Sequence, residues 1–92
     1  MNFEWDESKV DANLKKHGVS FEEAATVFDN PMAVIFDDEA HSIDEQREIV
    51  IGHSRKNRLL LVSFTERSNS IRIISDRLAT RKEREDYEQN AF

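Results

Sequence analysis

The 92-residue chain contains no cysteine and no long apolar run. Without cysteine, neither a disulfide framework nor a thiolate metal site can form, and the chain is compatible with a reducing compartment. A membrane-spanning helix needs about 18 or more apolar residues in succession. The first residues also lack the basic segment and the apolar stretch of a secretory signal. We therefore expect a soluble, cytoplasmic protein with no membrane partner, folded as one domain over residues 1–92.

Basic residues are scarce in the first half of the chain and frequent after it. The formal net charge is −6, yet residues 1–46 hold 3 Lys or Arg against 12 Asp or Glu, whereas residues 47–84 hold 10 against 4. The net charge argues against a nucleic-acid partner, but the later segment can form a local phosphate-binding surface. Charge runs are usually solvated, so these arginines are also explained as solvated residues or as partners of the acidic half.

The clearest structural signal lies at residues 59–77, where two β-rich runs flank a short polar break. This pattern predicts an antiparallel hairpin. If residues 67–70 form a four-residue turn, Phe64 faces Ile73, and one face becomes a core that helices cover. The apolar residues of that face are Leu60, Val62, Phe64, Ile71 and Ile73. The first run also carries leucines on its other face, which predicts a central strand.

Two helices are predicted before the sheet. Asp6 is a favourable N-cap for a helix over residues 7–16, and Gly18 follows at the position typical of a C-terminal glycine. Ser20 and Glu23 form the capping-box pattern of a second helix. Its predicted buried stripe consists of Phe21, Ala24, Ala25 and Phe28.

Two shorter strands are predicted between the second helix and the hairpin. They cover residues 33–36 and 46–53, and residues 3–5 are a candidate for a small additional strand. A polar, acidic segment at residues 37–45 connects the two strands, and we interpret it as the most mobile part of the chain. The sheet would then contain about four strands, mainly antiparallel.

A last helix is predicted after the hairpin. Thr80 and Glu83 form a second capping-box pattern, which predicts a helix that reaches about residue 90. Its sequence is almost wholly charged, so this helix is either weakly docked or completed by a partner. Two N-terminal helices packed on an antiparallel sheet, with a C-terminal helix, make an α+β domain.

Several segments, spaced in order along nearly the whole chain, are similar to those of a known family. They are residues 3–6, 13–24, 64–67 and 71–75, followed by Arg77, Ala79 and Thr80. Together they resemble the BrnT family of toxins. The spaced set is far more specific than any one of its segments, so the chain is identified as a member of that family, with residues 1–92 as a single BrnT-like toxin domain.

The resemblance implies a small RelE-like fold and the toxin of a type II toxin-antitoxin pair. The toxin would be a metal-independent endoribonuclease that cleaves RNA, needs no cofactor, and so inhibits translation and growth. A BrnA-like antitoxin would neutralise it, and the DNA-binding half of that antitoxin would let the complex bind its operator and repress its own operon. A higher-order toxin-antitoxin assembly is also implied. Residue spacing alone indicates only an α+β domain with a basic segment.

The resemblance also implies which residues are functional. The candidate catalytic residues are Lys16, His17, Thr65, Glu66, Arg67 and Arg77. From the basic segment we add three candidate RNA-binding residues, Arg47, Arg72 and Arg81. No metal site is expected, because the histidines His41 and His53 are isolated in the sequence.

The expected chemistry is attack by the RNA 2′-hydroxyl on the adjacent phosphate, which leaves a cyclic phosphate. Histidine can take or give the proton, and arginine offers a charged fork to phosphoryl oxygens. We hypothesise that His17 is the base or the acid, that Lys16 assists it, and that Arg67 and Arg77 hold the developing charge.

Ordinary structural roles compete with these assignments. Basic residues at a helix C-terminus satisfy its last carbonyls and interact favourably with its dipole, which explains Lys16 and His17 without catalysis. Thr65 is a common β-branched strand residue. Glu66 is also explained as the ion-pair partner of a neighbouring arginine.

Two residues depart from the family pattern. Asp76 stands between Ser75 and Arg77, where the family usually has Ala, and Leu78 stands where a basic residue is usual. A carboxylate beside Arg77 would pair with it or repel phosphate, so an alternative is a cleavage-deficient member that acts only as the folded half of a DNA-binding autorepressor complex. A third alternative is an acidic interaction domain with no role on RNA, which would show no RNA affinity at low salt.

Overall fold

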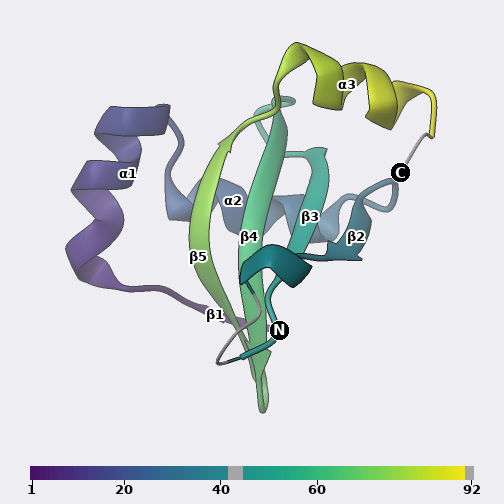
Figure 1. The fold of residues 1–92 in the computed structure, drawn as a ribbon. Coiled ribbons are helices and arrows are strands. Elements are labelled where there is room, and N and C mark those ends of the chain that lie inside the picture. The colour runs from purple at the N-terminus through teal and green to yellow at the C-terminus, as the bar shows by residue number, and fades with distance from the viewer. Residues whose placement is uncertain (42–44, 91–92) are drawn as a thin grey trace.

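The computed structural model describes residues 1–41 and 45–90, which form an α+β fold with a five-stranded sheet (Figure 1). The strands are β1 (Asn2–Glu4), β2 (Val34–Asp37), β3 (Glu48–His53), β4 (Leu59–Arg67) and β5 (Ser70–Leu78). The helices are α1 (Val10–His17), α2 (Phe21–Thr26) and α3 (Arg81–Glu88), with short 3-10 turns at Glu7–Lys9, Val27–Asp29 and Glu39–His41. Within the described ranges, no helix is long and apolar enough to cross a membrane.

The sheet has the order β1-β5-β4-β3-β2, so β4 is the central strand, as predicted. The prediction of about four strands is corrected to five, because β1, near the candidate strand at residues 3–5, pairs parallel with the first residues of β5. The other three pairings are antiparallel, so the sheet is mainly antiparallel, as predicted. Phe3 of β1 is partly buried against the core, which explains why this short segment joins the sheet. Beyond Arg72, β5 has no described strand on that side, and α1 lies there instead (Figure 1).

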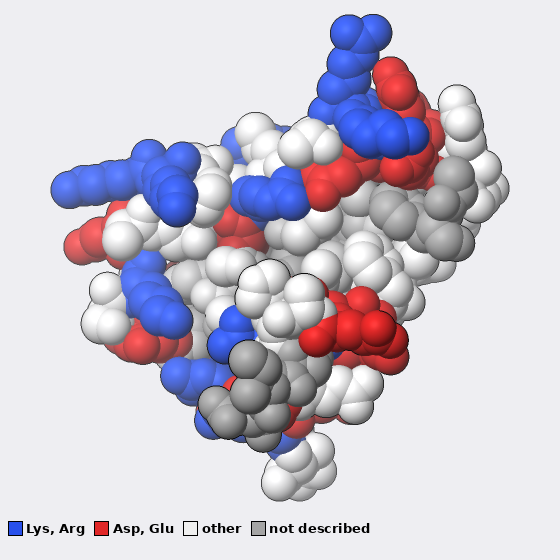
Figure 2. Space-filling view, in the orientation of Figure 1, with Lys and Arg blue, Asp and Glu red and all other residues white. Residues whose placement is uncertain are grey.

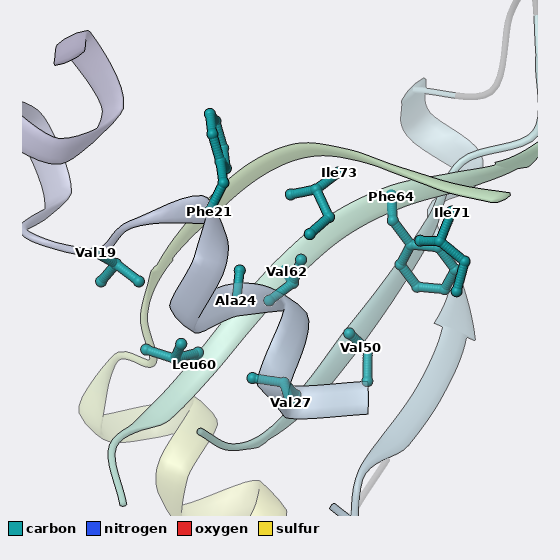
Figure 3. Close-up of a cluster of buried hydrophobic side chains, with 10 residues drawn as sticks. All are labelled: Val19, Phe21, Ala24, Val27, Val50, Leu60, Val62, Phe64, Ile71 and Ile73. Atoms are coloured by element: carbon teal, nitrogen blue, oxygen red, sulfur yellow. The ribbon is translucent and has the colours of Figure 1, made fainter. Parts of the chain in front are cut away.

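The hydrophobic core lies between α2 and one face of the sheet (Figure 3). The predicted core face of the hairpin is confirmed, because all five of its apolar residues are buried in this cluster. The predicted stripe of α2 is also confirmed, with Phe21 and Ala24 fully buried and Ala25 and Phe28 packed against the cluster. The stripe omitted Val27, which is fully buried just after α2. We call the opposite side of the sheet the open face.

The hairpin has the predicted pairing near its turn and an irregularity further along. Phe64 faces Ile73, and Arg67 pairs with Ser70 across a two-residue connection. Of the connection predicted to be mobile, residues 37–41 and 45 are described, and residues 42–44 lie outside the described residues. Asp37 belongs to β2, and Glu39–His41 form a 3-10 turn.

A β-bulge at Ile74 decides which side chains of β5 reach the open face. Ser63 pairs with Ser75 whereas the next residue of β4 pairs with Ile73, so Ile74 has no partner opposite it. One extra residue reverses the alternation of side chains beyond it. Asp76 therefore pairs with Val62, a core residue of β4, and its side chain points towards the core. Ser75 and Arg77 lie on the open face.

The predicted helix caps are mostly confirmed. The Asp6 side chain accepts from Ser8, although the first turn is a 3-10 turn, and α1 ends at Gly18 with a left-handed φ of 69°. The capping box at the start of α3 is complete. The box at α2 is only half formed, because Ser20 accepts from the backbone N–H of Glu23 while the Glu23 carboxylate turns into the core.

Candidate functional site

A groove of about 290 Å³ separates the α1 segment from β5. The helical side contributes Lys9, Ala12, Asn13, Lys16 and His17, and the strand contributes Ile74 and Ser75. Residues three and four apart lie on one helix face, so Asn13, Lys16 and His17 form a single surface towards β5. The structure thus places two of the predicted catalytic residues against the bulged part of the strand.

Arg77 lies on the same face of β5 as Ser75, about 7 Å further along the strand. Its Nη1 and Nη2 donate to Oε1 and Oε2 of Glu83 at 2.8 and 2.9 Å, and Nη1 also donates to the main-chain oxygen of Leu78. This pairing raises the pKa of Arg77 and lowers the pKa of Glu83 to about 2. Arg77 is therefore a charged, well-oriented group whose fork is already engaged by a carboxylate of α3.

Asp76 does not interact with Arg77, so the predicted pairing between these neighbours is wrong. The bulge turns Asp76 to the core side, where the residue is 1% exposed and its Oδ1 accepts a hydrogen bond from Asn13. The expected alternative, that its carboxylate repels phosphate, also does not apply, because Asp76 is buried and does not line the groove. Burial raises the pKa of Asp76 to about 7.

Three of the predicted catalytic residues lie near the hairpin turn rather than at the groove. Thr65 is 2% exposed, and its hydroxyl donates to the main-chain oxygen of Gln46 at 2.7 Å. Glu66 pairs with a core-facing residue of β5, so its side chain points away from the open face. Arg67 is exposed and its Nη2 lies 3.2 Å from the Glu45 carboxylate. The strand distance between the ends of the hairpin that carry Arg67 and Arg77 is roughly 20 Å. The six candidates therefore do not form one constellation.

The three predicted RNA-binding arginines are dispersed. Arg72 lies on the open face between the groove and the turn, 3.7 Å from the Glu4 carboxylate. Arg81 begins α3 and pairs with Glu85, while the partly buried Arg47 precedes β3. Figure 2 shows basic side chains over α1 and at α3, and a carboxylate cluster on the other side towards β2. Across residues 1–41 and 45–90, no group of three or more metal-ligating side chains could hold a metal ion.

The comparisons with known proteins agree with this fold. A family model described as "Ribonuclease toxin, BrnT, of type II toxin-antitoxin system" matches residues 5–83. The chain belongs to the BrnT toxin family. The 1.1 Å crystal structure of the Brucella abortus ribonuclease toxin BrnT is similar, with a TM-score of 0.69 and 26% identity over 88% of this chain and 99% of that chain. A comparison with curated proteins gave no match. As a BrnT toxin of a type II system, the chain has an antitoxin as its partner.

Three residues at this groove or beside it were not among the predicted site residues. They are Asn13, Ser75 and Glu83. Asn13 had a signal, because it stands one helical turn before His17 and therefore shares its face. Glu83 was recognised only as a cap, and it does cap the Thr80 N–H at 2.8 Å while it also holds Arg77. Ser75 had no signal, because an unmarked bulge directs it to the open face.

Proposed function

We propose that this BrnT toxin cleaves RNA without a metal ion in the groove between α1 and β5, and thereby inhibits translation and growth. The observation that carries the proposal is the grouping of Lys16, His17 and Ser75 around one groove, with Arg77 next along the same strand face. The family's description as a ribonuclease toxin supports the reaction class.

The proposed reaction needs one base, one acid and a cationic site for the phosphoryl oxygens. A base takes the proton of the 2′-hydroxyl, the 2′-oxygen bonds to phosphorus, and the bond to the 5′-oxygen breaks as an acid protonates that oxygen. The products are a 2′,3′-cyclic phosphate and a 5′-hydroxyl. His17 performs one of the two proton transfers, and Lys16 and Arg77 stabilise the developing negative charge.

The other candidates take supporting roles in this proposal. Four arginines outside the groove would contact phosphates on either side of the cleaved one. They are Arg47, Arg67, Arg72 and Arg81. We assign no chemical step to Thr65, whose buried hydroxyl is already donated, or to Glu66, which points away from the open face.

The test is cleavage of a labelled single-stranded RNA in excess EDTA by the parent protein, His17→Ala and Arg77→Ala. The parent should release fragments that end in cyclic phosphate, and each substitution should slow cleavage by about a hundredfold, as expected for loss of a proton-transfer group or a charge-stabilising group. Lys15→Ala is the matched control, because Lys15 is exposed on α1 and does not line the groove. Circular dichroism should show that each variant is folded.

Two outcomes would contradict this scheme. Cleavage by His17→Ala at the parent rate would exclude His17 from proton transfer. Loss of cleavage in EDTA, restored by a divalent cation, would exclude the metal-independent reaction.

The second candidate function is a cleavage-deficient member of the toxin-antitoxin complex. It is favoured by the Glu83 carboxylate, which occupies the fork of Arg77 that a phosphate would need. In this role the chain would bind a BrnA-like antitoxin and serve as the folded half of a higher-order complex that binds operator DNA. Growth arrest on induction without antitoxin, abolished by a joint substitution of His17 and Arg77, would favour the nuclease. Absence of arrest, with operator DNA retarded only by the toxin-antitoxin complex, would favour the second role.

A further inference from the structure

Asn13 connects the last turn of α1 to the strand beneath it. Its side-chain Nδ2 donates to the main-chain oxygen of Val19 at 3.1 Å and to Oδ1 of Asp76. An amide nitrogen carries two hydrogens, so these two bonds use both. The first bond holds the chain just after His17, and the second ties the helix to β5. Because Asn13 shares a helix face with Lys16 and His17, whatever fixes Asn13 also fixes their position over the groove.

The partner of Asn13 is the buried carboxyl group of Asp76, of which only one oxygen has a hydrogen-bond partner. Asp76 is 1% exposed, and among the described residues its Oδ2 is the one buried side-chain oxygen or nitrogen that lacks a hydrogen-bond partner. Three groups act on it: Asn13 from α1, Glu23 from α2 and Arg58 from the segment before β4. Burial has the largest effect and raises the pKa of Asp76, as does the nearby Glu23 carboxylate. The hydrogen bond from Asn13 and the charge of Arg58 lower it, and the resulting pKa is about 7.

We propose that Asp76 is a positioning residue that acts through Asn13, holding the α1 turn with Lys16 and His17 against β5, and that gain or loss of its proton changes how firmly this turn is held. The role of Lys16 and His17 in cleavage is taken from the proposed function. Asp76 itself does not touch RNA, because it is buried on the core side of β5.

The two protonation states of Asp76 differ in the strength of one hydrogen bond. A hydrogen bond to an ionised carboxylate is shorter and about twice as strong as the same bond to a neutral carboxyl group. Loss of the proton therefore strengthens the bond from Asn13 and holds α1 more firmly, while gain of the proton weakens it. The groove should be best ordered on the alkaline side of neutrality.

The first arm of the test is NMR spectroscopy of the full ¹⁵N-labelled chain between pH 5.5 and 8.5. The side-chain amide of Asn13 and the ring of His17 are followed in the parent, Asp76→Asn and Asp76→Ala. Asp11→Asn is the matched control, because it removes an exposed carboxylate of α1 that does not act on Asp76. In the parent and the control, the Asn13 amide should shift with a midpoint near pH 7, the pKa to which burial raises Asp76.

The substitutions of Asp76 should separate the hydrogen bond from the charge. Asp76→Asn keeps an acceptor for Asn13 and should abolish the titration of its amide, whereas Asp76→Ala should release that amide and move the His17 ring signals. An Asn13 amide that titrates identically in Asp76→Asn, or His17 signals that stay unmoved in Asp76→Ala, would overturn the proposal.

The second arm measures cleavage of single-stranded RNA by the same proteins. Asp76→Ala should lower kcat about ten- to a hundredfold, the range that a misplacement of about 1 Å can cause, with little change in KM. Asp76→Asn should recover most of the rate at pH 7 and lose the rise in rate with the midpoint near pH 7. Parent kcat and an unchanged pH profile in Asp76→Ala would overturn the proposal. If the folded parent does not cleave RNA, the proposed function fails, and the NMR arm alone decides whether Asp76 positions His17.

Discussion

Among the described residues, two carboxylates are buried, and their surroundings differ. Glu23 is 5% exposed and accepts hydrogen bonds from Nε and Nη2 of Arg58 and, at 2.6 Å, from the Ser54 hydroxyl. Asp76 is 1% exposed and accepts only from the neutral amide of Asn13. The hydrogen bonds from Arg58 hold the pKa of Glu23 below its ordinary value, whereas burial raises the pKa of Asp76 to about 7.

Both carboxylates hold the same stretch of chain, immediately after His17. Arg58, which Glu23 orients, donates to the main-chain oxygen of Gly18 at 3.1 Å, and Asn13, which Asp76 orients, donates to the oxygen of Val19. A buried carboxylate that accepts hydrogen bonds from a guanidinium and a hydroxyl is held as the anion, whereas burial of a carboxyl group with a single neutral donor favours the protonated form. Of the two supports of the α1 turn, the Glu23–Arg58 pair is therefore charged at neutral pH, whereas Asp76 has a pKa of about 7.

The largest expected effect comes from removing Arg58, the cation that pairs with Glu23. Arg58→Ala leaves Glu23 buried without a charged partner. Because the Arg58 side chain is 35% exposed, we expect a loss at the lower end of the range for buried ion pairs, about 3 kcal/mol of unfolding free energy. Urea denaturation at pH 7 measures this loss. Arg55→Ala is the control, because Arg55 is exposed in the same turn and its substitution should change stability by less than about 0.5 kcal/mol. Equal stabilities of the two variants would show that the Glu23 pair does not anchor this turn.

A smaller effect, with a defined pH dependence, is expected from Asp76→Asn. The pKa of Asp76 rises from 3.8 to about 7 on folding, so its favourable contribution is complete below about pH 3.8 and is lost as the pH rises through 7. Relative to Asp76→Asn, the parent should therefore lose about 1.4 kcal/mol of unfolding free energy per pH unit between pH 5 and 7. Urea denaturation at several pH values measures the difference, and a difference that is independent of pH would contradict the burial argument.

Much of the fold could be predicted from the sequence, because the predicted elements depend on local residue patterns. The hairpin, its core face and the central strand follow from alternation, and most helix ends follow from their caps. The Ser20–Glu23 and Thr80–Glu83 pairs look alike in sequence, yet only the second forms a complete capping box. What separates them is tertiary, because Arg58, 35 residues away along the chain, draws Glu23 into the core.

The candidate site was less predictable for a similar reason. The family resemblance indicated Lys16 and His17 as candidates, but which residues surround them depends on an extra residue of β5, Ile74, that has no sequence signature. This one bulge places Asp76 on the core side, away from Arg77 and the groove, while Arg77 lies on the open face with Ser75. Residue types predicted the chemistry that is available, and the strand register decided which side chains meet.

The smallest expected effect concerns the Arg77–Glu83 ion pair, which also has two hydrogen bonds but whose carboxylate is more exposed than that of Glu23. The side chains of Arg77 and Glu83 are 37% and 23% exposed, so Glu83→Gln should cost no more than about 1 kcal/mol of unfolding free energy. Glutamine also retains the capping pattern with Thr80. Because the substitution frees the fork of Arg77 for phosphate, RNA affinity at low salt should rise about fivefold, the equivalent of roughly 1 kcal/mol. Fluorescence anisotropy of a labelled RNA measures this, with Glu88→Gln, at an exposed position of the same helix, as the control for the lost negative charge. Equal affinities of the two variants would show that Glu83 does not compete with RNA for Arg77.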